Sequence, residues 1–469
     1  MKMTGKFNVA IVGGGPSGFY VAEALLQADI QIQVDMIERL PVPFGLVRYG
    51  VAPDHQKLKS VTAQFEDIAK NEDFSFFGNL HLGRDIDISE LREAYDAVVI
   101  ATGALSDRPL GIDGEGLKGS VSATEFVGWY NGHPDYRDRQ FDLSHPNAVI
   151  IGNGNVALDV CRILSKSVDE LRSSDICAHA LDALAESRVE DIYLVGRRGP
   201  AQAKFTTKEL REFGTLSHAE AVTEPSELEL NEASLSELAD PDGAGASKNL
   251  AVFRSFPAID HPRQKKRRIH FRFLLSPSRI LGREAVESVE FARMRLDGVA
   301  FKQTLQATGD EIVIPAGLVV RSVGYRGVEV PGIPFDNVRG TIPHRDGRVK
   351  GMDGVTVKGL YTAGWIKRGP SGVIGTNRAC GVDTASAILS DLATLASGGR
   401  IDTTMKRERF LNSLQSRPIQ LVNFEGWHRI DALEKTNGAT SGKPREKITS
   451  VQAMLDVSKR ERSLIAALG

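Results

Sequence analysis

The chain has 469 residues, which is too many for a single hydrophobic core, so two or three domains are expected. Hydrophobic residues make up 41% and charged residues 25% of the sequence, which is typical of an ordinary soluble globular protein. The formal net charge of −2 excludes a global attraction to nucleic acid or to an anionic membrane, so any such attraction must be local.

Cysteine usage and hydropathy predict the compartment. Cys161, Cys177 and Cys380 form neither a CxxC pair nor the spacing of metal ligands, so we expect a reducing compartment and no metal site. We expect this compartment to be the cytoplasm, the alternative being a mature organellar protein that is already processed. No apolar run reaches the roughly 18 residues of a membrane span. The start, MKMTGKF, leads almost at once into the first predicted strand, so we expect no signal or transit peptide.

Residues 7–18 carry the most informative pattern in the sequence. The apolar, β-branched run 9–12 predicts a buried parallel strand, and a helical pattern follows over 19–26. The turn between them has the spacing G-x-G-x-x-G, formed by Gly13, Gly15 and Gly18. These glycines permit a tight turn, the approach of a pyrophosphate to the backbone and close packing of the helix on the strand. The helix N-terminus then faces the phosphates.

A carboxylate follows at the end of the next predicted strand. The strand 32–37 ends at Glu38, 20 positions after Gly18. A carboxylate at this place suits a ribose diol and repels a ribose 2′-phosphate. The pattern therefore predicts a site for an adenine dinucleotide, either FAD or NAD; the alternative is a glycine turn without a ligand.

Two further stretches are predicted to reach the same ligand edge. Prolines and glycines make residues 41–59 a rigid, irregular loop, where ligand-contacting groups often lie. His55 closes this loop and has the right chemistry for proton transfer, although it is equally compatible with an ordinary helix start. The predicted strand 96–100 runs into Ala101, Thr102 and Gly103.

A second strand, glycine turn and helix follow. The strand 148–151 leads into GNGNVA at 152–157, which opens a helix. The next strand, 191–195, ends not in an acid but in Arg197 and Arg198. Two guanidiniums at this corner suit a phosphate and favour NADP(H) over NAD(H), the alternative being a solvated basic turn.

The middle of the chain has extreme local composition. A helical pattern at 178–188 explains the length of the second dinucleotide unit as an insertion. Residues 224–248 are acid-rich, and we expect a solvated excursion without chemistry. A basic run follows, made of Arg263, Lys265, Lys266, Arg267 and Arg268, with Arg272 shortly after. We expect either a solvated surface or a docking site for an acidic protein, because no nucleic-acid-binding motif accompanies the run.

The last part of the chain is predicted to return to the first sheet. We expect antiparallel strands at 269–275 and 285–296, a further strand at 318–323, and a strand and turn at 359–365. A glycine-rich approach then leads to a helix through residue 389, and its backbone N–H groups at 372–375 suit an anionic ring edge. Residues 405–469 form a mixed polar and helical tail with no predicted role.

Taken together, these motifs resemble those of the adrenodoxin reductase-like ferredoxin–NADP⁺ reductases, of the actinobacterial type without a fused ferredoxin domain. The resemblance runs from about residue 5 to the tail and is carried by GGGPSGFYVAEALL, VRYGVAPDH, VGWYNGHPD, IGNGNVALDVCRIL, GRRGPAQAKFTTKELREFG and GWIKRGPSGVIGTNRACG. It implies an α/β fold of two Rossmann-like dinucleotide-binding domains with a glutathione-reductase-like architecture. The NADP domain, 106–329, would be inserted into an FAD domain formed by 1–105 and 330–469.

The resemblance also implies site residues. FAD would contact Gly13, Gly15, Pro16, Ser17, Gly18, Glu38, Arg39, Leu46, Leu82, Ala101, Thr102, Gly103, Gly364, Trp365, Gly372, Val373 and Ile374. NADP(H) would contact Asn153, Gly154, Asn155, Val156, Arg197, Arg198 and Glu209, and Arg108 is a further cofactor-binding candidate. The catalytic candidates near the flavin are His55 and Glu212.

The function implied is electron transfer between NADPH and a one-electron iron–sulfur carrier. The cofactor supplies the difficult chemistry, so the protein mainly positions the reactants. The lack of a CxxC pair excludes the cysteine relay of disulfide reductases. We expect an acidic ferredoxin as partner, no nucleic acid, no membrane insertion, and a monomer or weak dimer. The alternatives are an electron-transfer subunit, oxidase or monooxygenase acting on a small molecule, and a non-catalytic protein that senses NADP(H).

Overall fold

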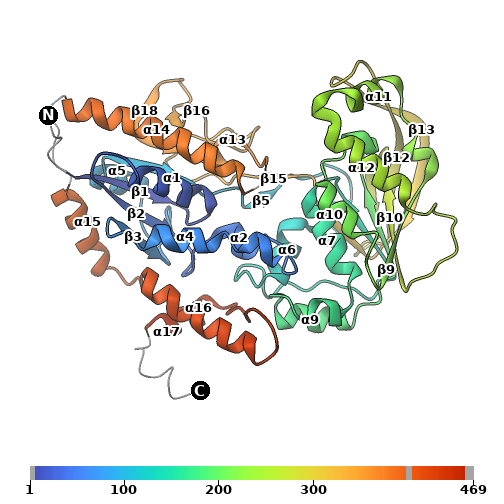
Figure 1. The fold of residues 1–469 in the computed structure, drawn as a ribbon, viewed down its shortest axis with the longest axis horizontal. Coiled ribbons are helices and arrows are strands. Elements are labelled where there is room, and N and C mark those ends of the chain that lie inside the picture. Colours follow the sequence, from blue (N-terminus) through green and yellow to red (C-terminus); the bar gives the residue numbers. More distant parts are fainter. Residues whose placement is uncertain (1–5, 373, 398–403, 460–469) are drawn as a thin grey trace. The chain divides into compact units, whose positions relative to one another are not determined.

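The computed structural model describes residues 6–372, 374–397 and 404–459 (Figure 1). The chain forms two compact units. Unit 1 comprises the described residues of Met1–Val51, His55–Ser106 and Tyr325–Gly469, and unit 2 comprises Ala52–Asp54 and Asp107–Gly324. The chain passes into unit 2 at β5 (Ser106–Asp107) and returns at β15 (Tyr325–Arg326). These crossings lie close to the expected limits at 105 and 330, but the short segment Ala52–Asp54 was not expected in unit 2.

Unit 1 is built on a seven-stranded sheet with the order β16-β17-β18-β4-β1-β2-β3. Its five parallel strands are β1 (Phe7–Val12), β2 (Ile32–Glu38), β3 (Phe74–Gly78), β4 (Ala97–Ile100) and β18 (Thr356–Thr362). An antiparallel edge is formed by β16 (His344–Arg345) and β17 (Arg348–Lys350). Every residue of β1 is buried, as expected of a parallel strand covered on both faces.

Helices cover both faces of this sheet. The helices of unit 1 are α1 (Pro16–Leu26), α2 (Gly45–Tyr49), α3 (Gln56–Lys59), α4 (Thr62–Ala69), α5 (Ile88–Ala94), α13 (Trp365–Arg368), α14 (Thr376–Ser397), α15 (Thr404–Gln415), α16 (Phe424–Ala439) and α17 (Val451–Lys459). Figure 1 shows α1 and α14 side by side over one face. The tail is not merely peripheral, because Trp427 and Ile430 of α16 belong to the same hydrophobic core as β1 and α1.

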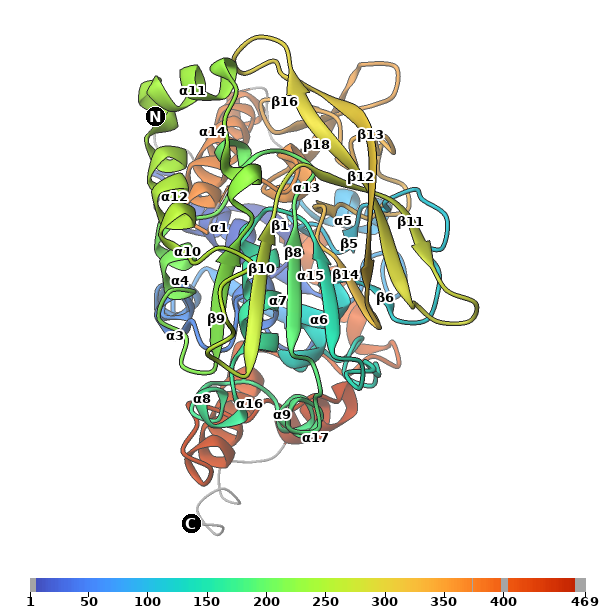
Figure 2. The ribbon, with the colours of Figure 1, turned by 90° about the vertical axis from the view of Figure 1, so that its right-hand side faces the viewer.

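Unit 2 repeats the arrangement with a six-stranded parallel sheet in the order β6-β14-β7-β8-β10-β9 (Figure 2). Its strands are β6 (Ser120–Ser122), β7 (Asn147–Ile151), β8 (Asp191–Val195), β9 (Ala219–Thr223), β10 (Arg267–Arg272) and β14 (Leu318–Arg321). Its helices are α6 (Ala123–Tyr130), α7 (Asn155–Ser165), α8 (Val168–Leu171), α9 (Ala178–Ala185), α10 (Thr207–Glu212), α11 (Glu232–Ala239), α12 (Ala244–Ser255) and the 3₁₀ turns η1 (Pro200–Gln202), η2 (Pro225–Leu228) and η3 (Pro241–Gly243). The helix expected at 178–188 is confirmed by α9.

A separate three-stranded antiparallel sheet is formed by β11 (Leu275–Leu281), β12 (Ser288–Asp297) and β13 (Thr304–Pro315). The expectation that 269–275 is an antiparallel strand is therefore wrong. These residues lie mostly in β10, which runs parallel between β8 and β9 and is buried along its whole length. Antiparallel pairing starts only at Leu275, after the left-handed residue Leu274 (φ +56°) has redirected the chain.

The acid-rich stretch 224–248 is not a solvated excursion. It forms η2, α11 and the beginning of α12, and Leu228 lies in the core of unit 2. Glu227, whose side chain is 1% exposed, accepts hydrogen bonds from Arg272 Nε to both of its carboxylate oxygens at 3.1 Å. Composition alone could not show this, because Glu227 neutralises the buried Arg272 and Glu237 accepts hydrogen bonds from the side chains of Gln202 and Gln303.

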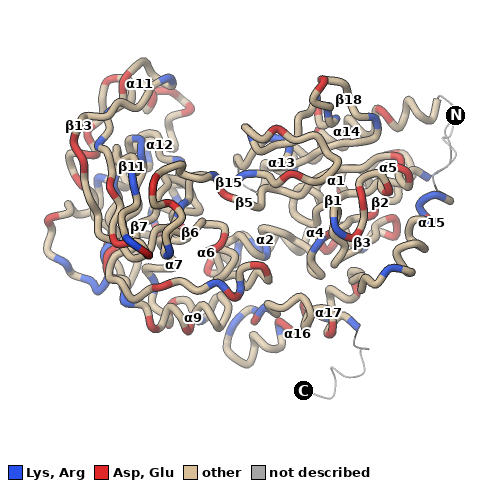
Figure 3. Tube along the Cα trace, turned by 180° about the vertical axis from the view of Figure 1, so that it is seen from behind, with Lys and Arg blue, Asp and Glu red and all other residues tan. Residues whose placement is uncertain are grey.

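The basic run is likewise not one exposed surface. Arg267 and Arg268 are buried in β10, and Arg268 Nε donates to Glu220 Oε1 at 2.9 Å. Arg263 pairs with Asp191 at 2.6 Å. Figure 3 shows blue and red segments interspersed along the chain of each unit. A docking site built from all five cations is therefore wrong, because two of them are inside the fold.

The fold has no candidate membrane span within residues 6–372, 374–397 and 404–459, where no helix is both long and apolar enough to cross a bilayer.

Candidate functional site

The first glycine turn of unit 1 connects β1 to α1 and admits no side chain at two positions. Gly13 has φ +116°, and a Cβ there would lie 2.4 Å from the Ala101 carbonyl oxygen, just beyond β4. A Cβ on Gly18 would lie 2.1 Å from the Gly13 carbonyl oxygen. The sequence pattern is thus explained by the close approach of the turn to β4 and of α1 to the turn.

The N-terminus of α1 is built to receive an anion. Gly15 precedes the helix in an extended conformation and Pro16 occupies its first turn. Within the described α1 there is no acidic side chain in this first turn and no side-chain cap. The N–H groups and the positive end of the helix dipole therefore remain for a ligand. Because β1 lies between β4 and β2, the turn sits where the strand order reverses, which is the usual ligand crevice of such sheets.

Glu38 lies beside this turn at the end of β2. Its Oε2 accepts from the Gly14 N–H at 2.8 Å and its Oε1 accepts from the Leu40 N–H at 3.0 Å. Burial raises the pKa of Glu38, although these backbone hydrogen bonds favour the ionised form. The neighbouring Arg39 is half-buried. The arrangement brings Glu38 and the glycine turn together, and the contact with a ribose stays a prediction.

Residues from the C-terminal half of the chain pack against α1 in unit 1. Gly364 has φ +77°, and a Cβ there would lie 2.1 Å from Ser17 Oγ. Ser17 Oγ in turn donates to Asn377 Oδ1 on α14 at 3.2 Å. The indole of Trp365 stacks on Tyr325 with ring centroids 5.5 Å apart. The structure therefore places Gly364 directly against Ser17 and links Ser17 to Asn377. Sequence reasoning did not single out Asn377, although it lies in the GTNRACG motif.

The remaining unit 1 candidates differ in their surroundings. Gly372 has φ +80°, and Ile374 packs against the core that contains β1. Leu46 and Thr102 are half-buried, as is Gly103, whereas Ala101 and Leu82 are buried. Leu82 belongs to the hydrophobic cluster that contains β4 residue Val98. Val373 lies outside the described residues.

Unit 2 contains a glycine turn of the same construction between β7 and α7. Gly152 has φ +146°, and a Cβ there would lie 2.1 Å from the Ser322 carbonyl oxygen, just beyond β14. No described atom lies within 4 Å of a Cβ built on Gly154, which precedes α7. The strand β7 lies between β14 and β8, so this turn also occupies a reversal of strand order.

The loop after η1 closes on this second turn. Asn153 O accepts from the Lys204 N–H, and Asn155 Oδ1 accepts from the Thr206 N–H, both at 2.9 Å. Thr206 Oγ1 donates to Glu209 Oε2 at 2.7 Å. The candidates Asn153, Asn155 and Glu209 are thereby brought together, while Val156 packs against the core of unit 2.

The two arginines predicted to bind a phosphate follow β8. Arg197 is exposed and Arg198 is half-buried. Arg198 Nε and Asn153 Oδ1 are both buried and have no hydrogen-bond partner among the described residues. Gly196 leaves no room for a side chain, since a Cβ there would lie 1.6 Å from Asn153 Nδ2. Two permanent cations and unsatisfied polar atoms beside a helix N-terminus fit a phosphorylated ribose. The remaining candidate, Arg108, is exposed at the start of unit 2.

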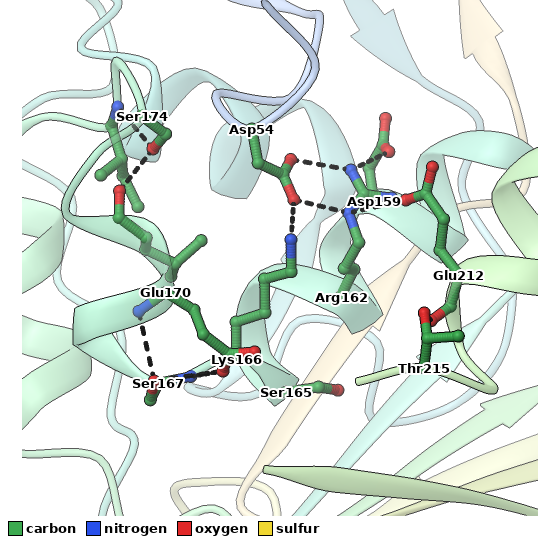
Figure 4. Close-up of polar contacts among 12 residues, drawn as sticks. Asp54, Asp159, Arg162, Ser165, Lys166, Ser167, Glu170, Ser174, Glu212 and Thr215 are labelled. Carbon is green, nitrogen blue, oxygen red and sulfur yellow. Dashed lines mark hydrogen bonds and ion pairs between the residues drawn. The ribbon is translucent and has the colours of Figure 1, made fainter. Parts of the chain in front are cut away.

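Four charged side chains form an ion cluster beside α7, and Figure 4 shows them: Asp54, Asp159, Arg162 and Lys166. Arg162, whose side chain is fully buried, donates to Asp54 from Nε at 2.7 Å and from Nη2 at 2.9 Å. Arg162 Nη2 also donates to Asp159 Oδ1 at 2.8 Å, and Lys166 Nζ donates to Asp54 Oδ2 at 2.7 Å. Burial raises the pKa of Asp54, but the hydrogen bonds and charge of Arg162, with Lys166, outweigh it and hold that pKa well below its usual range. The cluster keeps Ala52–Asp54 on unit 2.

The catalytic candidates belong to different units. Glu212, at the end of α10, has its Oε2 3.9 Å from Arg162 Nε in unit 2. His55 precedes α3 in unit 1, one peptide bond after Asp54. Each is described within its own unit, so their joint action near a flavin stays a prediction. The described residues contain no group of His, Cys, Asp and Glu side chains arranged to hold a metal ion.

Fold and geometry define a protein with two dinucleotide-binding folds, each with its glycine turn at a reversal of strand order. In agreement, residues 7–198 match the family model "Pyridine nucleotide-disulphide oxidoreductase". NADPH-ferredoxin reductase FprA of Mycobacterium tuberculosis is 44% identical, over 96% of this chain and 99% of that protein. The mitochondrial NADPH:adrenodoxin oxidoreductase of Bos taurus is 41% identical, over 96% and 91%.

A solved structure gives the same result. Mycobacterium tuberculosis FprA in complex with NADPH superposes with a TM-score of 0.88 at 43% identity, over 97% of this chain and 99% of that one. The chain belongs to the family of NADPH-ferredoxin reductases and NADPH:adrenodoxin oxidoreductases. This confirms the fold class and the family that the sequence motifs predict.

Proposed function

We propose that this protein is a ferredoxin–NADP⁺ reductase that transfers electrons between NADPH and a one-electron iron–sulfur carrier through bound FAD. One observation carries the proposal: the two glycine turns have the same construction, but the groups that follow the next strand differ in charge. Glu38 is the last residue of β2 in unit 1, whereas Arg197 and Arg198 lie just after β8 in unit 2. A carboxylate selects a ribose diol and guanidiniums select a 2′-phosphate, so each unit suits a different dinucleotide.

The residues of unit 1 fit FAD. The open N-terminus of α1 would hold the pyrophosphate and Glu38 the adenosine ribose. Gly364 and Gly372, both at positive φ, would let the backbone near α14 approach the ring system. When bound, FAD joins two-electron exchange with the nicotinamide to one-electron exchange with the carrier.

The residues of unit 2 fit NADPH. The N-terminus of α7 would hold its pyrophosphate, and Arg197 and Arg198 would hold the 2′-phosphate. Asn153 Oδ1 and Arg198 Nε, buried without partners among the described residues, would gain them from the ligand. We propose that His55 and Glu212 adjust the reaction without being indispensable, because the hydride acceptor belongs to the cofactor.

The names of the relatives support an iron–sulfur partner. That this partner is an acidic ferredoxin, that the protein is a monomer or weak dimer, and that it works in the cytoplasm are parts of the proposal that the sequence alone predicts. The basic run 263–268 does not supply the docking surface as a whole, because Arg267 and Arg268 are buried in β10.

Stopped-flow spectroscopy tests the proposal. NADPH should bleach the flavin absorbance of the purified protein, and an added ferredoxin should then be reduced and the flavin absorbance restored. NADH should act more slowly at equal concentration. Rapid turnover with an organic substrate without ferredoxin would instead indicate a small-molecule flavoenzyme, and failure of NADPH to bleach the flavin would indicate a sensor.

A further inference from the structure

The helix α16 in the C-terminal tail is joined to the segment that follows β2 by a buried ion pair within unit 1. Arg48 lies on α2 and Glu434 on α16, and their side chains are 4% and 0% exposed. Arg48 Nη1 donates to Glu434 Oε2 at 2.9 Å, and Nη2 donates to Oε1. The two residues are 386 positions apart, and both helices carry labels in Figure 1. A paired, buried bidentate contact of this kind specifies one geometry.

Glu434 is itself fixed from the side of the tail. Its Oε2 accepts from Arg445 Nη1 at 3.1 Å, and its Oε1 accepts from the Ile448 N–H at 2.9 Å. The Arg48 guanidinium lies 5.2 Å from the ring centroid of Trp427, one turn of α16 away from the start of the helix. The cation is thus enclosed by the tail on two sides and is not free to turn toward solvent.

The opposite side of the same segment is seated on the first glycine turn. The Phe44 N–H donates to the Gly14 carbonyl oxygen at 2.7 Å. A Cβ on Gly45 would lie 3.1 Å from Gly15 Cα, so the two backbones are in contact. Residues 44–49, which are Phe44 and the short helix α2 and are called the loop 44–49, are therefore placed between the glycine turn and α16.

Phe44 shows that this placement costs free energy. It has φ +82°, which is unfavourable for a residue with a bulky side chain, and such strain persists only where the surroundings hold it. Its ring meets the Trp427 ring edge-on with centroids 5.5 Å apart. The hydrogen bond to Gly14 and the contact with Trp427 together hold the strained residue.

We propose that Glu434 is a positioning residue for the flavin: acting through Arg48, α16 holds the loop 44–49 against the glycine turn in the conformation that binds FAD. The tail then completes the cofactor site without contributing a contact to the cofactor. Preorganisation of this kind increases affinity because the loop does not have to be ordered when the ligand binds. The inference rests on the proposed function only in placing FAD at the glycine turn of unit 1.

The test is the affinity of FAD for the apoprotein, measured by quenching of flavin fluorescence. Glu434→Gln keeps the shape of the side chain and removes its charge, and should raise the FAD Kd about tenfold, the effect of losing one charge-assisted hydrogen bond. Glu434→Asp, which keeps the charge, should raise it less. The affinity of unit 2 for NADP⁺ should be unchanged in both variants.

Glu227→Gln is the matched control. Glu227 is also a buried carboxylate paired with an arginine, Arg272, but it lies in unit 2. This variant should lose comparable thermal stability and keep the parent's FAD Kd. The inference is overturned if Glu434→Gln binds FAD as tightly as the parent, or if Glu227→Gln loses FAD equally, since the effect would then be general destabilisation.

Two further outcomes are decisive. If Glu434→Gln does not fold, Glu434→Asp alone must show weaker FAD binding together with unchanged NADP⁺ binding, and a parent-like FAD Kd overturns the inference. If the parent apoprotein binds no FAD at all, the proposed function fails and the inference fails with it. A parent that binds FAD and variants that match it refute only the role of Glu434.

Discussion

Replacing Asp54 with asparagine should destabilise unit 2, because the change removes a negative charge from the buried ion cluster on α7. The Asp54 side chain is 9% exposed and receives hydrogen bonds from Arg162 and Lys166. Asparagine preserves the shape and one acceptor oxygen, so no cavity is opened. The measured loss of stability therefore shows how strongly the buried Arg162 guanidinium depends on the Asp54 carboxylate.

The expected loss of stability follows from the burial of the Arg162–Asp54 ion pair. Removing one partner of a buried ion pair costs about 3–5 kcal/mol, and we take about 3 kcal/mol because Asp159 still neutralises part of the Arg162 charge. Unit 2 contains roughly 220 residues. For a domain of this size each kcal/mol lowers Tm by about 2–4 °C, so Asp54→Asn should lower the Tm of unit 2 by about 6–12 °C.

The stability that Asp54 contributes to unit 2 should depend on pH in a definite direction. Burial raises the pKa of Asp54, but Arg162 and Lys166 together lower it well below the unfolded value of about 3.9. A carboxyl with a depressed folded pKa contributes its full stability above the unfolded pKa and loses it as the pH falls through the folded pKa. The Tm difference between parent and Asp54→Asn should therefore be constant above about pH 5 and should narrow below about pH 4.

Differential scanning calorimetry of the full chain measures this difference, and added NADP⁺ identifies the transition of unit 2 because a bound ligand raises its Tm. Asp169→Asn is the control, since Asp169 is 90% exposed and lies 3.4 Å from Arg172. An exposed pair contributes less than about 1 kcal/mol. A parent-like Tm for Asp54→Asn, or an equal loss in both variants, would refute the reasoning.

Three predictions concern the cofactors. Replacing Arg197 and Arg198 with alanine should weaken NADPH binding by about one to two decades and spare NADH turnover; an equal loss with both nucleotides in steady-state assays would contradict the 2′-phosphate assignment. Glu38→Ala should release FAD on dilution, seen as loss of flavin absorbance, while NADP⁺ binding persists; the reverse result would mean that the two sites are exchanged. His55→Gln should slow flavin reduction by less than about 10²-fold in stopped-flow traces, and abolished reduction with FAD still bound would give the histidine a direct role.

The sequence by itself determined the two dinucleotide folds and the charge that distinguishes them. In each fold a strand, a glycine turn and a helix are contiguous in the chain, so the sequence alone predicts the fold. The structure shows that Gly13 and Gly152 approach the end of a neighbouring strand too closely to carry a side chain. Glu38 and the Arg197–Arg198 pair are equally local signals, because Glu38 ends the strand β2 and the two arginines come within three residues of the end of β8.

Only the tertiary structure decided which charged groups are inside. The pairs Arg162–Asp54 and Arg48–Glu434 join residues 108 and 386 positions apart, and no local pattern connects them. The basic run reads as a surface in the sequence, yet Arg268 is buried on β10 because Glu220 of the neighbouring strand β9 neutralises it. Burial of a charge depends on a partner that the fold brings near, whereas a glycine turn depends only on its own backbone, and so the turns were predictable and the ion pairs were not.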